Sequence, residues 1–332
     1  MRNLTPVEYQ IFKDILCLKQ EKLKKVIRLF LEKNNYTNIC ETKDYVYAEG
    51  DIPIALVAHL DTVFPSPPKH IFYDRVENVM WSPNGLGADD RAGVFAIMQI
   101  LRDGLRPHVI FTTDEEKGCL GSLVLSKKDM PFKELKYLIQ LDRSGANDCV
   151  FYECNNAHFI DYVEKFGFLT DIGSFSDISA LCPSWKIAGV NLSIGYYHEH
   201  YETEHLDVSA MLFTIKRIKK MLMDSDSVDQ FKYIPSYKSR YQWNFNSIYT
   251  NDNFEVVKCK KCEKEFFEAE TIPVKSLTGD TSYYCIDCIG HNVNWCSICG
   301  EPYEVCDEIE YPGYCPDCKR LIWNPSRNNS MK

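Results

Sequence analysis

The chain has 332 residues, 45% of them hydrophobic and 26% charged, which is ordinary globular composition with enough apolar residues for a sizeable core. Its formal net charge of -9 argues against general binding to nucleic acid or to a membrane surface. The first residues, MRNLTPVEYQ, contain no apolar signal core, and no run of about 18 apolar residues occurs. We therefore expect a cytoplasmic protein with one large domain and one smaller one.

Residues 1–223 alternate between helical patterns and short apolar runs. Residues 6–33 carry apolar side chains at helical spacing and predict one amphipathic helix. Strands alternating with helices predict an α/β fold, a three-layer αβα sandwich with a mixed, mostly parallel sheet. The expected strands are 52–59, 108–113, 136–142, 149–153 and 187–195, and the expected helices are 89–103, 157–166, 176–182 and 207–223.

Residues 224–255 have a different character. They are polar and rich in aromatic residues, and they lack a clear period. We interpret them as a linker or a segment that wraps around the domain. The cysteine-rich residues 256–332 follow as a separate predicted domain.

Acids and histidines stand at or just after the ends of several predicted strands. In open α/β sheets, ligands gather at the carboxyl ends of the strands, so these side chains are expected to converge. Two imidazoles with several carboxylates are a ligand set for a pair of divalent cations, most naturally zinc. The residues are His59, Asp61, Asp89, Asp90, Glu115, Glu116, Asp142, His198, His200 and His205.

Taken singly, these residues have ordinary explanations. Glu115 and Glu116 are typical of a solvated charge pair, and Asp89 with Asp90 is typical of a helix N-terminus. His59 alone is typical of a hydrogen-bonded core histidine. The order of the motifs is more specific: H-x-D, G-A-D-D-x-A-G, D-E-E-x-G, a strand ending in Asp, and a late His followed by a Glu.

With these five motifs in this order, residues 52–210 resemble the catalytic domain of the co-catalytic dizinc exopeptidases, such as leucyl-type aminopeptidases and tripeptidase-like enzymes. The resemblance implies two catalytic divalent metals, expected to be zinc. It implies that His59 and Asp142 bind one metal, that Glu116 binds the other, that Asp89 bridges them, and that His200 is the last ligand.

The resemblance also assigns two supporting roles. Asp61 would fix the tautomer of the His59 imidazole. Glu115 would be the general base, because a carboxylate outside the metal shell keeps its lone pairs free for a proton. His198 stays open as the alternative to His200, whereas His205 is the weakest candidate. Arg91 and Arg143 adjoin the predicted ligands and could bind substrate or form structural ion pairs.

The predicted function is cleavage of an amide bond, with short peptides as substrates of an aminopeptidase. Only 57 residues separate Asp142 from His200, too few for the lid domain of larger family members. Two alternatives stay open. The same site could hydrolyse a small non-peptide amide or remove an acyl group, or the domain could be an inert scaffold whose tail binds a partner.

The tail carries four C-x-x-C pairs, which provide eight thiolates for two tetrahedral structural zinc sites. Pairing could be sequential, as in zinc ribbons, or interleaved, with Cys306 and His291 as spare ligands. Residues 255–332 have 9 Lys+Arg against 13 Asp+Glu, which disfavours nucleic acid as a partner and favours protein contact or self-association. The pairs are Cys259/Cys262, Cys285/Cys288, Cys296/Cys299 and Cys315/Cys318.

Overall fold

The computed structural model describes residues 2–235 and, further on, residues 256–267, 271–275, 280–285, 288, 293–295 and 302–304. The chain divides into two compact units, residues 1–240 and 241–332. The boundaries expected from the sequence, at 223 and 255, stay a prediction. Within the described part of the chain, no helix combines the length and the apolar character that crossing a membrane requires.

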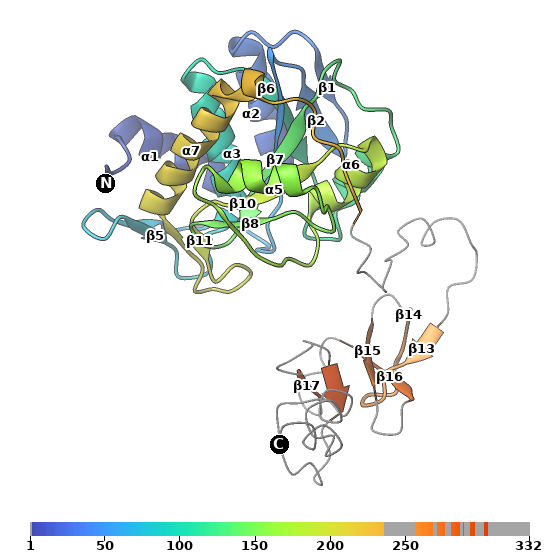
Figure 1. Cartoon of the computed structure of the whole chain (residues 1–332). Helices are drawn as coiled ribbons and strands as arrows, with labels where there is room; N and C mark the ends of the chain where they lie inside the picture. Colours follow the sequence, from blue (N-terminus) through green and yellow to red (C-terminus); the bar gives the residue numbers. More distant parts are fainter. Residues whose placement is uncertain are drawn as a thin grey trace, which may run out of the picture. The chain divides into compact units, whose positions relative to one another are not determined.

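The first unit is built on an eight-stranded sheet, shown with its helices in Figure 1. Its strand order is β1-β2-β6-β3-β7-β10-β8-β9. The central neighbours β6, β3, β7 and β10 are parallel to one another, and β2 and β8 flank them antiparallel. The prediction of a mixed, mostly parallel sheet is therefore confirmed. The strands are β1 (Ile39–Glu41), β2 (Tyr45–Ala48), β3 (Ile52–His59), β6 (Pro107–Thr112), β7 (Tyr137–Arg143), β8 (Asp148–Val150), β9 (Leu169–Thr170) and β10 (Gly189–Ser193).

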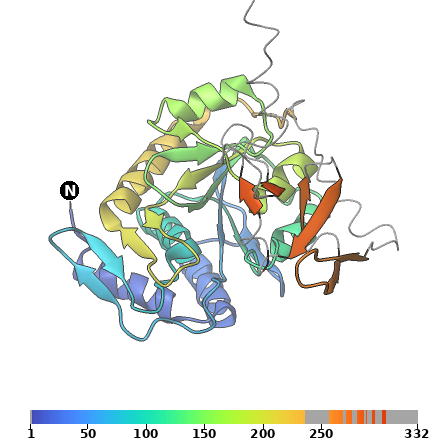
Figure 2. The ribbon, with the colours of Figure 1, turned by 90° about the horizontal axis from the view of Figure 1, so that it is seen from below.

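Both faces of this sheet are buried, as the αβα sandwich requires. Along β3, Ile54, Leu56 and Ala58 belong to one core cluster, whereas Ala55 and Val57 belong to the other. This alternation follows the two-residue period of a strand. Figures 1 and 2 show helices on both faces, and the second cluster includes side chains of α4 and α6.

Residues 6–33 form two helices, not the one helix predicted from their apolar spacing. The first begins with a capping box, in which Thr5 accepts from the Glu8 N–H and Glu8 accepts from the Thr5 N–H. The chain is extended at Leu18 and Lys19, and the second helix starts at Gln20. The apolar spacing therefore continues across the break between the two helices and does not reveal it. The helices are α1 (Pro6–Cys17), α2 (Gln20–Lys33), α3 (Ala88–Arg102), α4 (Leu120–Ser126), α5 (Ala157–Glu164), α6 (Asp177–Trp185) and α7 (Val208–Met223), with the short 3-10 turn η1 (Ser225–Ser227).

A small antiparallel sheet lies beside the main fold, in the order β11-β12-β5-β4. Between Asp142 and His200, residues 143–199 form strands and helices of the main fold and the strand β11. They therefore contain no inserted lid domain. The strands of the small sheet are β4 (Phe72–Asp74), β5 (Val79–Trp81), β11 (Tyr196–Tyr197) and β12 (His205–Asp207).

The predicted linker begins along the surface of the first unit. Lys232 forms a β-bridge with Ile187, and Pro235 forms one with Cys154. Residues 236–255 lie outside the described residues.

The described residues of the second unit form two small sheets. The hairpin β13–β14 carries the first C-x-x-C pair in its turn, and the other sheet has the order β16-β15-β18-β17. Val274, Tyr284 and Val293 form a small apolar cluster. The strands are β13 (Val256–Lys258), β14 (Glu265–Phe267), β15 (Thr271–Lys275), β16 (Thr281–Cys285), β17 (Val293–Trp295) and β18 (Pro302–Glu304).

Candidate active site

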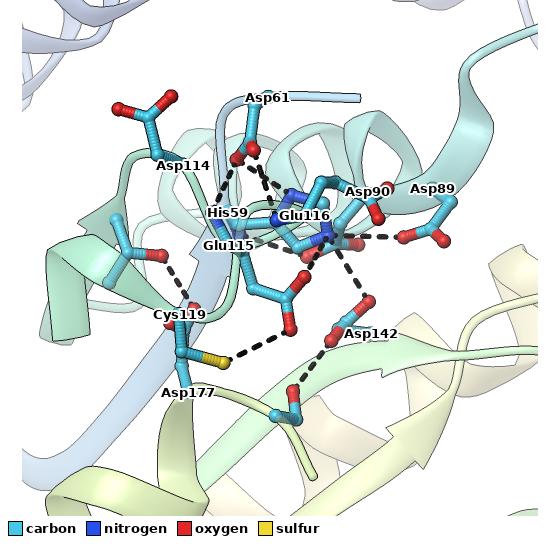
Figure 3. A network of polar contacts seen from close by, with 12 residues as sticks. His59, Asp61, Asp89, Asp90, Asp114, Glu115, Glu116, Cys119, Asp142 and Asp177 are labelled. Atoms are coloured by element: carbon cyan, nitrogen blue, oxygen red, sulfur yellow. Dashed lines mark hydrogen bonds and ion pairs between the residues drawn. The ribbon is translucent and has the colours of Figure 1, made fainter. Parts of the chain in front are cut away.

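The predicted site residues converge at the carboxyl ends of the parallel strands. His59 is the last residue of β3, and Asp142 is the next-to-last residue of β7. Glu115 and Glu116 lie in the loop after β6, which ends at Thr112. Figure 3 shows these side chains around the His59 imidazole.

Asp89 lies between the two imidazoles. Its Oδ1 is 3.1 Å from His59 Nε2, and its Oδ2 is 3.2 Å from His200 Nε2. His59 Nε2 is also 3.4 Å from Asp142 Oδ1, and His200 Nε2 is 3.1 Å from Glu116 Oε2. The donors therefore form two groups of one imidazole and one carboxylate, and Asp89 belongs to both.

Asp61 fixes the glutamate loop as well as facing the His59 ring. Its two oxygens accept the backbone N–H groups of Glu115, at 3.0 Å, and Glu116, at 3.1 Å. Its Oδ1 also lies 3.3 Å from His59 Nδ1. Asp61 thus connects the H-x-D motif to the D-E-E motif.

Asp90 anchors the start of α3 and was not assigned a role from the sequence. It is fully buried; its Oδ2 accepts the His59 N–H at 3.2 Å and its Oδ1 accepts the Gly93 N–H at 3.0 Å. A Cβ on Gly93 would lie 2.3 Å from Asp90 Oδ1 and 2.5 Å from the Leu141 carbonyl oxygen. The glycine of D-D-R-A-G is therefore required by this close approach.

Gly93→Ala should lower the free energy of unfolding by about 1–3 kcal/mol, because the new methyl group has no space. The crowded Leu141 carbonyl directly precedes the predicted ligand Asp142. The substitution should also weaken metal binding by displacing Asp90 or the end of β7. Urea denaturation and metal titration check both effects. Gly173→Ala is the control, because its Cβ would approach side-chain atoms of Val150 and Tyr152 at 3.0 Å or more and no backbone carbonyl.

Glu204, the acid of the late His-Glu motif, supports the loop that carries Asp89. Its carboxylate is buried, and it accepts the backbone N–H groups of Gly87 and, at 3.0 Å, of Asp89. Burial raises the pKa of Glu204 to about 7. The glutamate of the late His-Glu motif therefore holds the backbone that carries Asp89.

Besides the nearby Gln140, which donates to Asp142 Oδ2 at 3.1 Å, three side chains from distant segments hold Asp142. Ser176 Oγ donates to Asp142 Oδ2 at 2.6 Å, and Tyr196 Oη donates to Oδ1 at 3.2 Å. The Asn191 amide accepts the Asp142 N–H at 2.9 Å. None of these three residues stands beside a predicted ligand in the sequence, so no local signal marks them.

Glu115 lies inside the cluster, whereas Glu116 faces His200. Glu115 Oε2 is 3.9 Å from His59 Nε2, and its Oε1 accepts from Cys119 Sγ at 3.4 Å. Burial raises the pKa of Glu115 to about 9, and the carboxylates of Asp142 and Asp177 add to the shift. Asp177 is fully buried beside this group, and its Oδ2 accepts from Thr112 Oγ1 at 2.5 Å.

The remaining candidates lie elsewhere. The His198 ring lies near His205, with centroids 5.3 Å apart, and its Nδ1 lies 3.4 Å from Thr203 Oγ1. Arg91 is buried and donates to the carbonyls of Ile15 and Leu18 at the end of α1.

Arg143 forms an ion pair with Asp171. Arg91 and Arg143 therefore both make structural contacts.

A cavity of about 430 Å³ borders Asp61 and Glu116, and its other walls are largely apolar, from Leu18 and the loop 62–68.

The donor set fits a divalent cation. Donor atoms of His59, Asp89 and Glu116 lie within 4.8 Å of one another, as do those of His59, Asp90 and Asp142. Glu116 Oε1 is buried and has no hydrogen-bond partner among the described residues. The Asp89 and Glu116 carboxylates raise the pKa of His200 to about 11.

The second unit brings four tail cysteines together. The Sγ atoms of Cys259, Cys262, Cys285 and Cys288 lie within 4.8 Å of one another. Burial opposes ionisation of Cys259, but the N–H groups of Cys262 and Cys285 lower its pKa to about 6. A four-thiolate cluster of this kind fits one tetrahedral zinc ion.

The first two C-x-x-C pairs therefore meet in space. The other predicted ligands, Cys296, Cys299, Cys315 and Cys318, and the spare candidates Cys306 and His291, lie outside the described residues.

Imidazoles and carboxylates at the carboxyl ends of the parallel strands, together with a match to a peptidase family, indicate a metallopeptidase. Residues 42–163 match the model of Peptidase family M28. The matched range includes His59, Asp89, the glutamate pair and Asp142, and it ends before His200. No curated protein sequence matches the chain significantly.

Solved structures share the fold. Aminopeptidase PepT from Bacillus cereus superposes with a TM-score of 0.55 at 12% identity, over 66% of this chain and 98% of that one. A tripeptidase from Staphylococcus aureus gives 0.55 at 11% identity, over 67% and 98%. The TET aminopeptidase of a Thaumarchaeota archaeon gives 0.54 at 11% identity, over 66% and 97%. At these identities the similarity establishes the fold.

Proposed function

We propose that the chain is a two-metal aminopeptidase that acts on short peptides. The observation that carries this proposal is the Asp89 carboxylate, which directs one oxygen to each of two imidazoles, His59 and His200. Asp142 and Glu116 would complete the two ligand groups. When bound, two zinc ions would polarise the scissile carbonyl and lower the pKa of the attacking water.

The chain's own residues divide the remaining work. Glu115 would accept a proton from the attacking water and deliver it to the leaving amine. Asp61 would hold the backbone of both glutamates, so that Glu115 and Glu116 keep separate positions. Ser176 and Tyr196 would orient Asp142. Bound cations would also lower the pKa of Glu115 from the value that burial gives it.

A substrate panel tests the proposed reaction. The zinc-loaded protein should hydrolyse aminoacyl p-nitroanilides and short peptides with a free N-terminus. N-acetylated versions of the same peptides should be cleaved at least about tenfold more slowly, because a free amine is what distinguishes aminopeptidase substrates. Faster hydrolysis of N-acyl amino acids would instead identify a deacylase with the same site.

The tail cluster is proposed as a structural zinc site. Cys259→Ser should remove about one zinc per chain, because one of four thiolate ligands is lost, and should unfold part of the second unit. Elemental analysis and amide hydrogen exchange measure the two effects. Cys17→Ser, which changes an exposed free cysteine, is the control and should keep the full zinc content. An unchanged zinc content in Cys259→Ser would contradict the assignment.

A further inference from the structure

The small sheet β11-β12-β5-β4 has one buried face. Tyr196, Leu206 and Met80 are opposite one another in the register and are at most 2% exposed. Because side chains alternate along each strand, their neighbours point to the other face. Tyr196 therefore points toward the site, where it contacts Asp142, and Tyr197 points to the outer surface.

The outer face carries four rings in direct cross-strand register. Tyr197 is opposite His205, His205 is opposite Trp81, and Trp81 is opposite Phe72. The Tyr197 and His205 rings stack at 5.5 Å and 14°, and Phe72 and Trp81 stack at 5.5 Å and 20°. Phe72 is 47% exposed and Trp81 is 39% exposed. We name Tyr197, His205, Trp81 and Phe72 the aromatic row.

One end of the aromatic row borders a cavity that His200 also lines. Tyr197 lines a cavity of about 450 Å³ together with Ser144, His200 and Tyr201. His200 is a proposed metal ligand, and Tyr201 is 70% exposed. Four adjacent strands span three spacings of about 4.8 Å, or about 15 Å, which is the length of roughly four residues of extended peptide.

We propose that the aromatic row binds the part of a peptide substrate that lies beyond the residues at the metal site. This inference rests on the proposed function and narrows its substrate class to peptides of about five or more residues with aromatic or apolar side chains. Exposed aromatic rings attract such side chains by apolar burial and by edge-to-face contacts. The continuity of the row with the cavity of His200 favours a substrate over a second copy of the chain as the occupant.

A length series tests the proposal. The substrates are leucyl p-nitroanilide and peptides of two to six residues with an N-terminal leucine, carrying phenylalanine or alanine at positions three to five. In the unmodified protein, kcat/KM relative to the anilide should rise about tenfold up to five residues, more for phenylalanine than for alanine. Trp81→Ala and Phe72→Ala should abolish this rise. Phe213→Ala, at a 49% exposed phenylalanine on α7, is the matched control and should keep it.

Two outcomes would overturn the proposal. One is a length dependence that is equal in the unmodified protein and in Trp81→Ala. The other is a dimer in sedimentation experiments that Trp81→Ala dissociates while the length dependence is unchanged, since the row would then be a contact between copies.

If no substrate of any length is cleaved, the proposed function fails and the row is tested separately by binding. Calorimetric titration of the Glu115→Gln variant with the hexapeptide, with and without Trp81→Ala, then decides. Equal affinity in the two proteins would overturn the row as a peptide site.

Discussion

Glu115→Gln is expected to lower kcat by about a hundredfold to ten-thousandfold while both metals stay bound. The amide is nearly isosteric with the carboxylate, so the loop held by Asp61 should keep its shape, but the amide cannot accept the proton of the attacking water. The backbone N–H of Glu115, which donates to Asp61, is unchanged. Turnover of an aminoacyl anilide and elemental analysis of the same sample measure the two quantities.

The neighbouring glutamate provides the contrast. Glu116→Gln should lose metal as well as activity, because Glu116 Oε2 lies 3.1 Å from the imidazole of His200. Glu134→Gln, at an exposed glutamate, is the control for the loss of one negative charge.

Near-normal turnover in Glu115→Gln would show that another group is the base.

Asp89→Ala should have the second large effect, the loss of both metals from one substitution. Asp89 is the one carboxylate in contact with both imidazoles among the described residues, so both ligand groups lose a donor. We expect metal affinity to fall by more than about a hundredfold, beyond the loss typical when a group that only orients a ligand is changed. Competition with a chromogenic chelator measures this affinity.

Variants that change only one ligand group distinguish the loss of a bridging ligand from general damage to the metal site. His200→Ala and Asp142→Ala each remove a ligand from one group only and should retain about one metal. A retained metal in Asp89→Ala, with unchanged affinity, would show that Asp89 does not bridge. Circular dichroism of each variant checks that the fold is intact.

The central strands were predictable because each is an apolar run closed by polar residues. The run 52–59 is β3 residue for residue, and its alternation serves two core clusters. The corner at Leu18 was not predictable, since apolar spacing continues through it and the break depends on local backbone angles. Arg91, in a distant segment, donates to the Leu18 carbonyl, and no local pattern reports such a contact.

The convergence of His59, Asp89, Glu116, Asp142 and His200 was predicted from motif order and strand ends. The groups that hold these residues were not. Ser176 and Tyr196 reach Asp142 from segments 34 and 54 residues away along the chain. Cross-strand register likewise creates the aromatic row from residues of four strands, which a linear pattern does not relate.

The most direct test is anomalous diffraction from crystals of the zinc-loaded protein. The two-metal account predicts two peaks in the site, each about 2.0–2.2 Å from a different oxygen of Asp89. His59 and Asp142 should bind one ion, and Glu116 and His200 the other. A single peak, or a second ion bound by His198 in place of His200, would contradict the account.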